Sequence, residues 1–123
     1  MIGLSFKLII FIFVVIHDYL FEDYDTCLEL LLDPSTQLTP IQSIIYTLLK
    51  GHTRWDSVFF MGIAKTGYLK EKNHAFFPGF PIILSSLAGL ITDIIGDYTI
   101  SLMVVGFALN TVFYFLNILL VYK

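Results

Sequence analysis

The polar residues best able to carry out chemistry lie in one stretch, residues 54–81, which reads RWDSVFFMGIAKTGYLKEKNHAFFPGFP. Asp56 is the first candidate, because a positioned carboxylate at a membrane surface can act as a general base. A structural role is the alternative, since an aspartate at the start of a helix caps a backbone N–H and contributes ~1 kcal/mol. The two roles are compatible, because a capping contact also orients the carboxylate.

Positively charged side chains surround this carboxylate in the sequence. Arg54, His52 and Lys65 can contact lipid headgroups, or they can hold a phosphate, for which arginine offers two parallel hydrogen bonds. His74 lies in a run of polar residues and is expected to be exposed to solvent. The residue types therefore allow an anionic ligand near Asp56 without requiring one.

Other signatures of chemistry are missing from the sequence. It has no glycine-rich phosphate loop, no Ser/His/Asp order and no metal-ligand spacing. The single cysteine, Cys27, has no partner for an internal disulfide, and we interpret it as a small apolar filler. Asp25 offers a second carboxylate, but nothing in the sequence brings it to Asp56.

The composition indicates a membrane protein. Of the 123 residues, 57% are hydrophobic and only 14% are charged, and the mean hydropathy is +0.82. A soluble domain this small has too high a surface-to-volume ratio to bury so much apolar surface. The net charge of -3 is weak and scattered, without a basic stripe, which excludes nucleic acid as a partner.

Three apolar runs are expected to cross the membrane as helices, giving an all-α polytopic membrane protein in one domain. They cover residues 1–21, residues 81–95 and residues 98–122. A helix needs ~20 residues to span the hydrocarbon core. The first run is favoured as an uncleaved signal anchor over a cleaved signal peptide, because no A-x-A-like site follows it. Lys7 would extend to one interface of this span.

The segment between the first two spans, residues 22–80, is expected to be a luminal loop with short interfacial helices. One helix is predicted over Pro40–Leu49, with Gly51 as its C-terminal stop. Another is predicted over Trp55–Thr66, capped by Asp56 or Ser57 and ended at Gly67.

Three further local features complete the expected organisation. A short helix is predicted near residues 25–33, and the prolines of residues 76–81 predict a bend without regular helix. Gly96 and Asp97 form a tight break on the opposite side of the membrane from the luminal loop. Asn110 and Asn117, seven residues apart on one helix face, are expected to bond a neighbouring helix, or alternatively to contact a ligand.

Two ordered motifs then suggest a family. W-D-x-x-x-F-x-x-I-A-x-x-G-Y begins at Trp55, and N-x-A-F-F-P-G-F-P runs from Asn73 through Pro81. In these motifs the chain resembles the second mannosyltransferase of GPI-anchor assembly, of the GT-C class of multi-span glycosyltransferases. The resemblance covers essentially the whole chain. Family members are several-fold longer, so the chain resembles their N-terminal part and is expected to belong to a longer enzyme.

The resemblance implies a reaction in the endoplasmic reticulum membrane. The donor would be dolichyl-phosphate-mannose and the acceptor the GPI-precursor glycolipid, which gains a second, α1,6-linked mannose on the luminal face. Because the donor is β-linked and the product α-linked, the transfer would invert the anomeric carbon. It implies no cofactor and no metal, and it allows an accessory membrane subunit as a partner.

The chemistry of such a transfer then suggests roles for six residues, of which Asp56 matches the carboxylate of the family motif. Asp56 would be the catalytic base, and Trp55 would pack against a sugar face or hold the Asp56 loop. Arg54, Lys65 and His74 would bind the substrate phosphate, and Phe77 would contribute to the substrate site.

Two other classes of function remain open at this point. One is a non-catalytic membrane subunit or truncated remnant whose loop docks a partner of the same pathway. The other is a fragment of a small transporter or channel, which is disfavoured because the spans carry few ionisable residues and those lie near their ends.

Overall fold

The computed structural model describes residues 2–21, 32, 35–69 and 71–121, and every secondary-structure element in these ranges is helical. The elements are α1 (Ile2–Leu20), α2 (Pro40–Leu49), η1 (Lys50–His52), α3 (Asp56–Thr66), η2 (Glu71–Ala75), α4 (Gly79–Ile95) and α5 (Tyr98–Val121). The expected all-α fold is thus confirmed for this part of the chain. The helix predicted near residues 25–33 and Cys27 lie outside the described residues.

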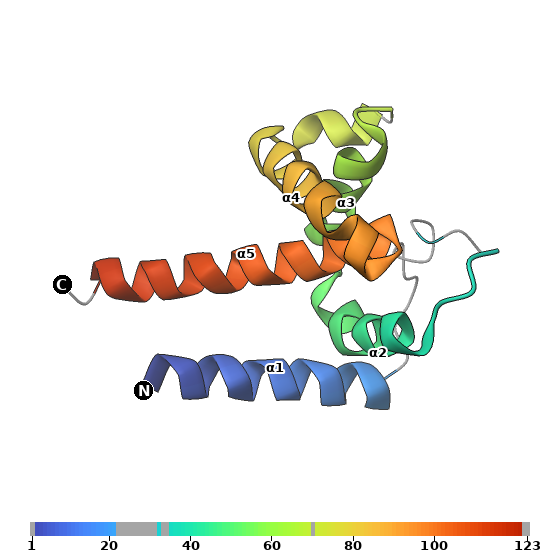
Figure 1. Ribbon diagram of the computed structural model, residues 1–123. Coiled ribbons are helices and arrows are strands. Elements are labelled where there is room, and N and C mark those ends of the chain that lie inside the picture. Colours follow the sequence, from blue (N-terminus) through green and yellow to red (C-terminus); the bar gives the residue numbers. More distant parts are fainter. Residues whose placement is uncertain (1, 22–31, 33–34, 70, 122–123) are drawn as a thin grey trace.

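The two long helices, α1 and α5, lie side by side and run in opposite directions (Figure 1). The Tyr114 hydroxyl of α5 donates to the Gly3 carbonyl of α1 at 3.2 Å, and the rings of Phe11 and Phe107 are 5.4 Å apart. The shorter helices gather around the end of this pair that lies away from both termini of the chain (Figure 1).

Two helices in the described residues are long and apolar enough to cross a membrane. They are Gly3–Leu20 within α1 and Tyr98–Val121, which is α5. The expected third span, α4, is apolar but has 17 residues, so its length is about 26 Å against the ~30 Å of a hydrocarbon core. The predicted count of about three spans is therefore not confirmed.

The break between α4 and α5 is a tight turn, as predicted, but its neighbours differ from the expectation. Gly96 has φ 82, and the Asp97 carboxylate accepts a hydrogen bond from the Ile100 backbone N–H at 2.8 Å. The Gln42 side-chain amide of α2 donates to the Ile95 carbonyl at 2.7 Å. The turn thus lies against α2. This contact does not fit the expectation that the turn and the loop containing α2 lie on opposite sides of a membrane.

The packed core lies mainly between α4 and α5. Its members are apolar side chains with almost no solvent exposure, and they include Leu84, Ala88, Ile100, Leu102 and Met103. The contact between α1 and α5 is made by long side chains instead. There the Lys7 ammonium lies 5.8 Å from the ring centre of Phe107 and 5.2 Å from that of Tyr114, so its charge faces α5 aromatics.

Helix α2 has the predicted bounds, with an N-terminus fixed by a reciprocal cap. The Gln42 backbone N–H donates to the Thr39 hydroxyl at 3.3 Å, and the Thr39 N–H donates to the Gln42 side chain at 2.8 Å. The prediction that Gly51 stops this helix is wrong, because the chain continues directly into η1. Gly51 instead allows a close approach to α1: a Cβ there would lie 3.0 Å from Val14 and 3.1 Å from Asp18.

The bounds of α3 and α4 correct two further expectations and confirm a third. Trp55 is the N-cap of α3 and makes no side-chain capping bond, so the cap predicted for Asp56 or Ser57 is wrong. Gly67 ends α3 with φ 76, as predicted. The prolines do not exclude helix over residues 76–81, since α4 begins at Gly79 and includes Pro81 in its first turn, where a missing N–H costs nothing.

The expectation for the α5 asparagines is wrong for one of them. Asn117 donates from its side chain to the Phe113 carbonyl of its own helix at 2.9 Å. Such a local bond satisfies the amide without a neighbouring helix.

Candidate functional site

Asp56 is the first residue of α3 and lies at the edge of a cleft of about 310 Å³ between α3, α4 and α5. We call it the α5 cleft. Its walls combine apolar side chains with a few polar ones: His52, Thr53, Asp56, Ser57, Phe60, Met61, Phe80, Leu84, Leu102, Met103, Gly106, Phe107, Asn110 and Phe113. Largely apolar walls with a small number of convergent polar groups are typical of sites for small ligands.

His52 supplies an unusual polar group to this cleft. Its ring stacks on Phe11 at 5.1 Å and meets the edge of Phe107 at 5.2 Å. Its Nε2 atom is buried and has no hydrogen-bond partner among the described residues. Burial, aided by the positive charge of Lys7, lowers the pKa of His52 below its ordinary value of 6.5. The imidazole is therefore neutral at pH 7 and can accept or donate a hydrogen bond but supplies no charge.

The backbone before Asp56 adopts a conformation that side chains rarely take. Trp55 has φ 54, and it is the only residue other than glycine with positive φ in the described part of the chain. This conformation costs on the order of 1–3 kcal/mol and is found preferentially at functional sites. The turn is closed by hydrogen bonds from the Ser57 N–H to the Arg54 carbonyl at 3.2 Å and from the Val58 N–H to the Trp55 carbonyl at 3.1 Å. It directs Asp56 into the first turn of α3, where the helix dipole favours a negative charge.

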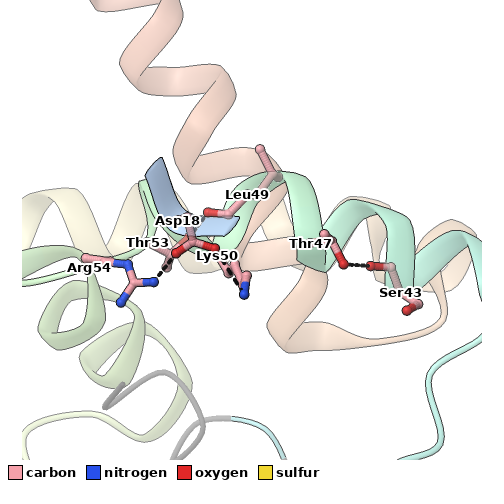
Figure 2. Close-up of polar contacts among 7 residues, drawn as sticks. All are labelled: Asp18, Ser43, Thr47, Leu49, Lys50, Thr53 and Arg54. Carbon is pink, nitrogen blue, oxygen red and sulfur yellow. Dashed lines mark hydrogen bonds and ion pairs between the residues drawn. The ribbon is translucent and has the colours of Figure 1, made fainter. Parts of the chain in front are cut away.

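A second cleft, of about 420 Å³, lies on the α1 side of the same loop, and we call it the α1 cleft. It is lined by residues of α1 and of the loop: Phe13, Val14, His17, Asp18, Phe21, Gly51, Arg54 and Trp55. Figure 2 shows the ionic contacts on this side, where the Asp18 carboxylate accepts from Arg54 and lies 3.0 Å from the Lys50 ammonium. Only 4% of the Asp18 side chain is exposed.

The remaining predicted site residues line neither cleft. Lys65, nine positions after Asp56 on α3, donates to the Thr99 hydroxyl at 2.9 Å. At ~1.5 Å per residue this places its Cα about 13 Å along the helix from that of Asp56. The ring of His74, a side chain that is exposed as expected, lies 5.2 Å from that of Tyr68. Phe77 is 80% exposed.

The structure thus sorts the predicted residues into groups. It brings Asp56 together with His52 in the α5 cleft and Arg54 together with Trp55 in the α1 cleft. Sequence reasoning missed the position of Asp18, because 36 residues separate it from Arg54 and no spacing rule links them. It left Asn110 open between a helix contact and a ligand contact, and Asn110 lines the α5 cleft. The described residues contain no group of three or more His, Cys, Asp or Glu side chains placed to hold a metal ion.

Fold and site together define a helical protein with two helices fit to cross a membrane and, beside one of them, a largely apolar cleft with a few polar groups. The chain belongs to the family described as Mannosyltransferase (PIG-V), whose match covers residues 2–123. This membership agrees with the family suggested by the two sequence motifs.

Several curated proteins are similar to parts of the chain. GPI alpha-1,6-mannosyltransferase 2 of Rattus norvegicus is 42% identical over 60 residues, covering 43% of this chain and 12% of the relative. GPI mannosyltransferase 2 of Aspergillus fumigatus is 35% identical over 85 residues, covering 69% of this chain and 19% of the relative. GPI alpha-1,6-mannosyltransferase 2 of Homo sapiens is 48% identical over 44 residues, covering 36% of this chain and 9% of the relative.

These matches span less than a fifth of the length of each of the three relatives. No solved structure matches the chain.

Proposed function

We propose that this chain forms part of a GPI mannosyltransferase that adds the second, α1,6-linked mannose to the GPI-precursor glycolipid. The proposed donor is dolichyl-phosphate-mannose, and the proposed location is the endoplasmic reticulum membrane. Family membership over residues 2–123 and the names of the relatives support this proposal. The two long apolar helices support a place in a membrane, where both lipid-linked substrates would be found.

The observation that carries the proposal is that Asp56 lines the α5 cleft, which His52 also lines. In a one-step inverting transfer, the acceptor hydroxyl oxygen attacks the anomeric carbon of the donor mannose. The bond from that carbon to the phosphate oxygen breaks, and its electron pair leaves with dolichyl phosphate. The acceptor proton passes to a base, and Asp56 is the carboxylate that this cleft offers for the role.

His52 and Asn110 are two further polar residues of the cleft that this proposal uses. A neutral imidazole with an unused Nε2 and a side-chain amide can hydrogen-bond sugar hydroxyls without adding charge. The apolar walls would exclude water from the glycosyl donor, which limits its hydrolysis. Neither residue would take part in bond breaking.

The residues predicted to bind substrate differ in their surroundings and in their distance from the two clefts. Arg54 lies on the other side of the loop from Asp56, where its charge is shared with Asp18. Trp55, 88% exposed, offers an aromatic face to a sugar or a lipid headgroup. Lys65, His74 and Phe77 stay proposals as contacts to the donor or acceptor outside the two clefts. The scheme uses no metal and no cofactor, and an accessory membrane subunit stays a proposed partner.

The test is transfer by the full-length protein in cells that lack addition of the second mannose. We expect expression to restore GPI-anchored proteins at the cell surface and to convert the one-mannose intermediate to the two-mannose product. Membranes from these cells should transfer label from dolichyl-phosphate-mannose to the intermediate. A protein that is present at normal level in the membrane and restores neither would overturn the enzyme and favour the non-catalytic subunit.

A further inference from the structure

We propose that Asp18 is a positioning residue, which holds the loop that carries His52 and Asp56 against the end of α1. This proposal rests on the proposed function, because it concerns the placement of the same proposed base. It gives α1 a role beyond that of a membrane anchor.

The loop between α2 and α3 is short. The ring of His52 stacks on Phe11 of α1, whereas the hydrogen bonds of Thr53 tie the loop to α2. The Thr53 hydroxyl donates to the Leu49 carbonyl at 2.9 Å, and the Thr53 N–H donates to the Lys50 carbonyl at 3.1 Å. These bonds fix the turn of η1 but leave open the orientation of the segment that leads to Asp56.

Asp18 supplies the contacts on the other side of this loop. Its carboxylate pairs with Lys50 at 3.0 Å and with Arg54, so both ends of the segment 50–54 meet one group on α1 (Figure 2). The carboxylate is almost fully buried, with 4% exposed, whereas the side chains of Lys50 and Arg54 are 35% and 21% exposed. A buried carboxylate that pairs with two cations holds both of them, because each cation that moves away loses its attraction to a negative charge that water screens only weakly.

Gly51 provides a second, independent sign that the loop is seated on α1. It lies between the two cations in sequence, and a Cβ at this position would lie within 3.1 Å of both Val14 and Asp18. The backbone of the loop therefore packs directly on α1, so closely that an added methyl group would press on Val14 and Asp18. Ionic contacts and backbone packing act at the same point.

The ion pair with Asp18 fixes the position of Asp56 through the two residues that precede it. Arg54 is held at α1, Trp55 turns the chain with φ 54, and Asp56 follows at the edge of the α5 cleft. With the Arg54 end free, the same turn would no longer aim the carboxylate at one place in the cleft. A displacement on the order of 1 Å of a catalytic group can lower a rate by 10²-fold.

The experiment uses the full-length protein in membranes and measures transfer and proteolysis in parallel. Asp18→Asn is expected to lower kcat by roughly 10- to 100-fold with little change in the donor KM. It should also speed tryptic cleavage after Lys50, because a released loop samples the extended conformation that a protease needs. Cleavage after Lys65, on α3, should stay unchanged.

The charge-exchanged variant Asp18→Arg/Arg54→Asp separates positioning from general instability. We expect it to recover part of kcat, because the ion pair between positions 18 and 54 is restored. Protection at Lys50 should not return, because the new cation at position 18 repels Lys50. Full kcat in Asp18→Asn would overturn the positioning role. The positioning role would also be overturned if Asp18→Asn were cleaved faster at both Lys50 and Lys65 and the charge-exchanged variant recovered no kcat. The proteolysis does not depend on mannose transfer. A wild-type protein that transfers no mannose would overturn the proposed function. The tryptic cleavage at Lys50 would still test whether Asp18 holds the loop.

Discussion

Trp55 and Asp56 are neighbours in the sequence but line different clefts. Trp55 lines the α1 cleft, and Asp56 lines the α5 cleft. The change of side is made by the backbone at Trp55, whose φ of 54 turns the chain between the ion-paired Arg54 and the first turn of α3. Two residues that form one dipeptide motif are therefore expected to act on different parts of the substrates.

Asp56→Asn should abolish most of the transfer while leaving the protein in the membrane at its normal level. Asparagine keeps the size and hydrogen-bonding ability of the side chain but removes its basicity, so we expect a loss of 10²- to 10⁴-fold in kcat. Transfer from labelled dolichyl-phosphate-mannose in membranes measures this. Asp93→Asn, the same change at an exposed position of α4 outside both clefts, is the control and should transfer normally. Normal transfer by Asp56→Asn would remove the base assignment.

His52 should make the protein less stable as the pH falls. Its pKa is lowered in the fold by burial, so below about pH 6.5 the unfolded chain binds more protons than the folded one and the free energy of unfolding decreases. The decrease in the free energy of unfolding is complete once the pH is below the pKa of His52 in the folded state. Thermal unfolding in detergent at pH 7.5 and pH 5.5 measures it.

His52→Phe removes this titration and can keep the stacking between Phe11 and Phe107. Its Tm should therefore fall less between the two pH values than that of the wild type. His17→Phe, at an exposed position of α1, serves for comparison and should leave the wild-type difference in place. Equal differences for all three proteins would argue against a role for His52.

Gly51→Ala should destabilise the fold. The added Cβ would meet Val14 at 3.0 Å and Asp18 at 3.1 Å, and overpacking of this kind costs roughly 1–3 kcal/mol. Gly89→Ala is the matched control, because a Cβ there meets nothing within 4 Å and alanine favours the helix by roughly 0.5–1 kcal/mol. Unfolding of the two variants in detergent should shift Tm in opposite directions, and a stable Gly51→Ala would show that the loop can move away from α1.

Phe76 and Phe77 should differ in what their replacement by leucine affects. The Phe76 ring stacks on Phe59 at 5.0 Å and contacts the edge of Phe60 at 5.1 Å, so Phe76→Leu should lower Tm through lost aromatic contacts worth about 0.5–1.5 kcal/mol each. Phe77 is 80% exposed, so Phe77→Leu should leave Tm unchanged. A loss of transfer in Phe77→Leu without a loss of Tm would support its proposed contact to substrate, and a large fall in Tm would contradict the exposure.

Most of the helices were predictable from the sequence, because periodicity and end signals are local. The bounds of α2 followed from Pro40 and the apolar spacing, and Gly67 and Gly96 marked real breaks because each has positive φ. The two longest helices followed from the length of their apolar runs. The role of Gly51 was misjudged, because Gly51 allows the loop to approach α1 closely, a contact that lies outside the local sequence.

The candidate site was predictable in its residues but not in its arrangement. The types and order of Trp55, Asp56 and Arg54 indicated a basic and acidic group near a membrane. Only the tertiary structure decided that Asp18 pairs with Arg54 and that His52 and Asn110 share a cleft with Asp56. The physical reason is that charge pairing and burial depend on distances between segments tens of residues apart, which a one-dimensional pattern does not contain.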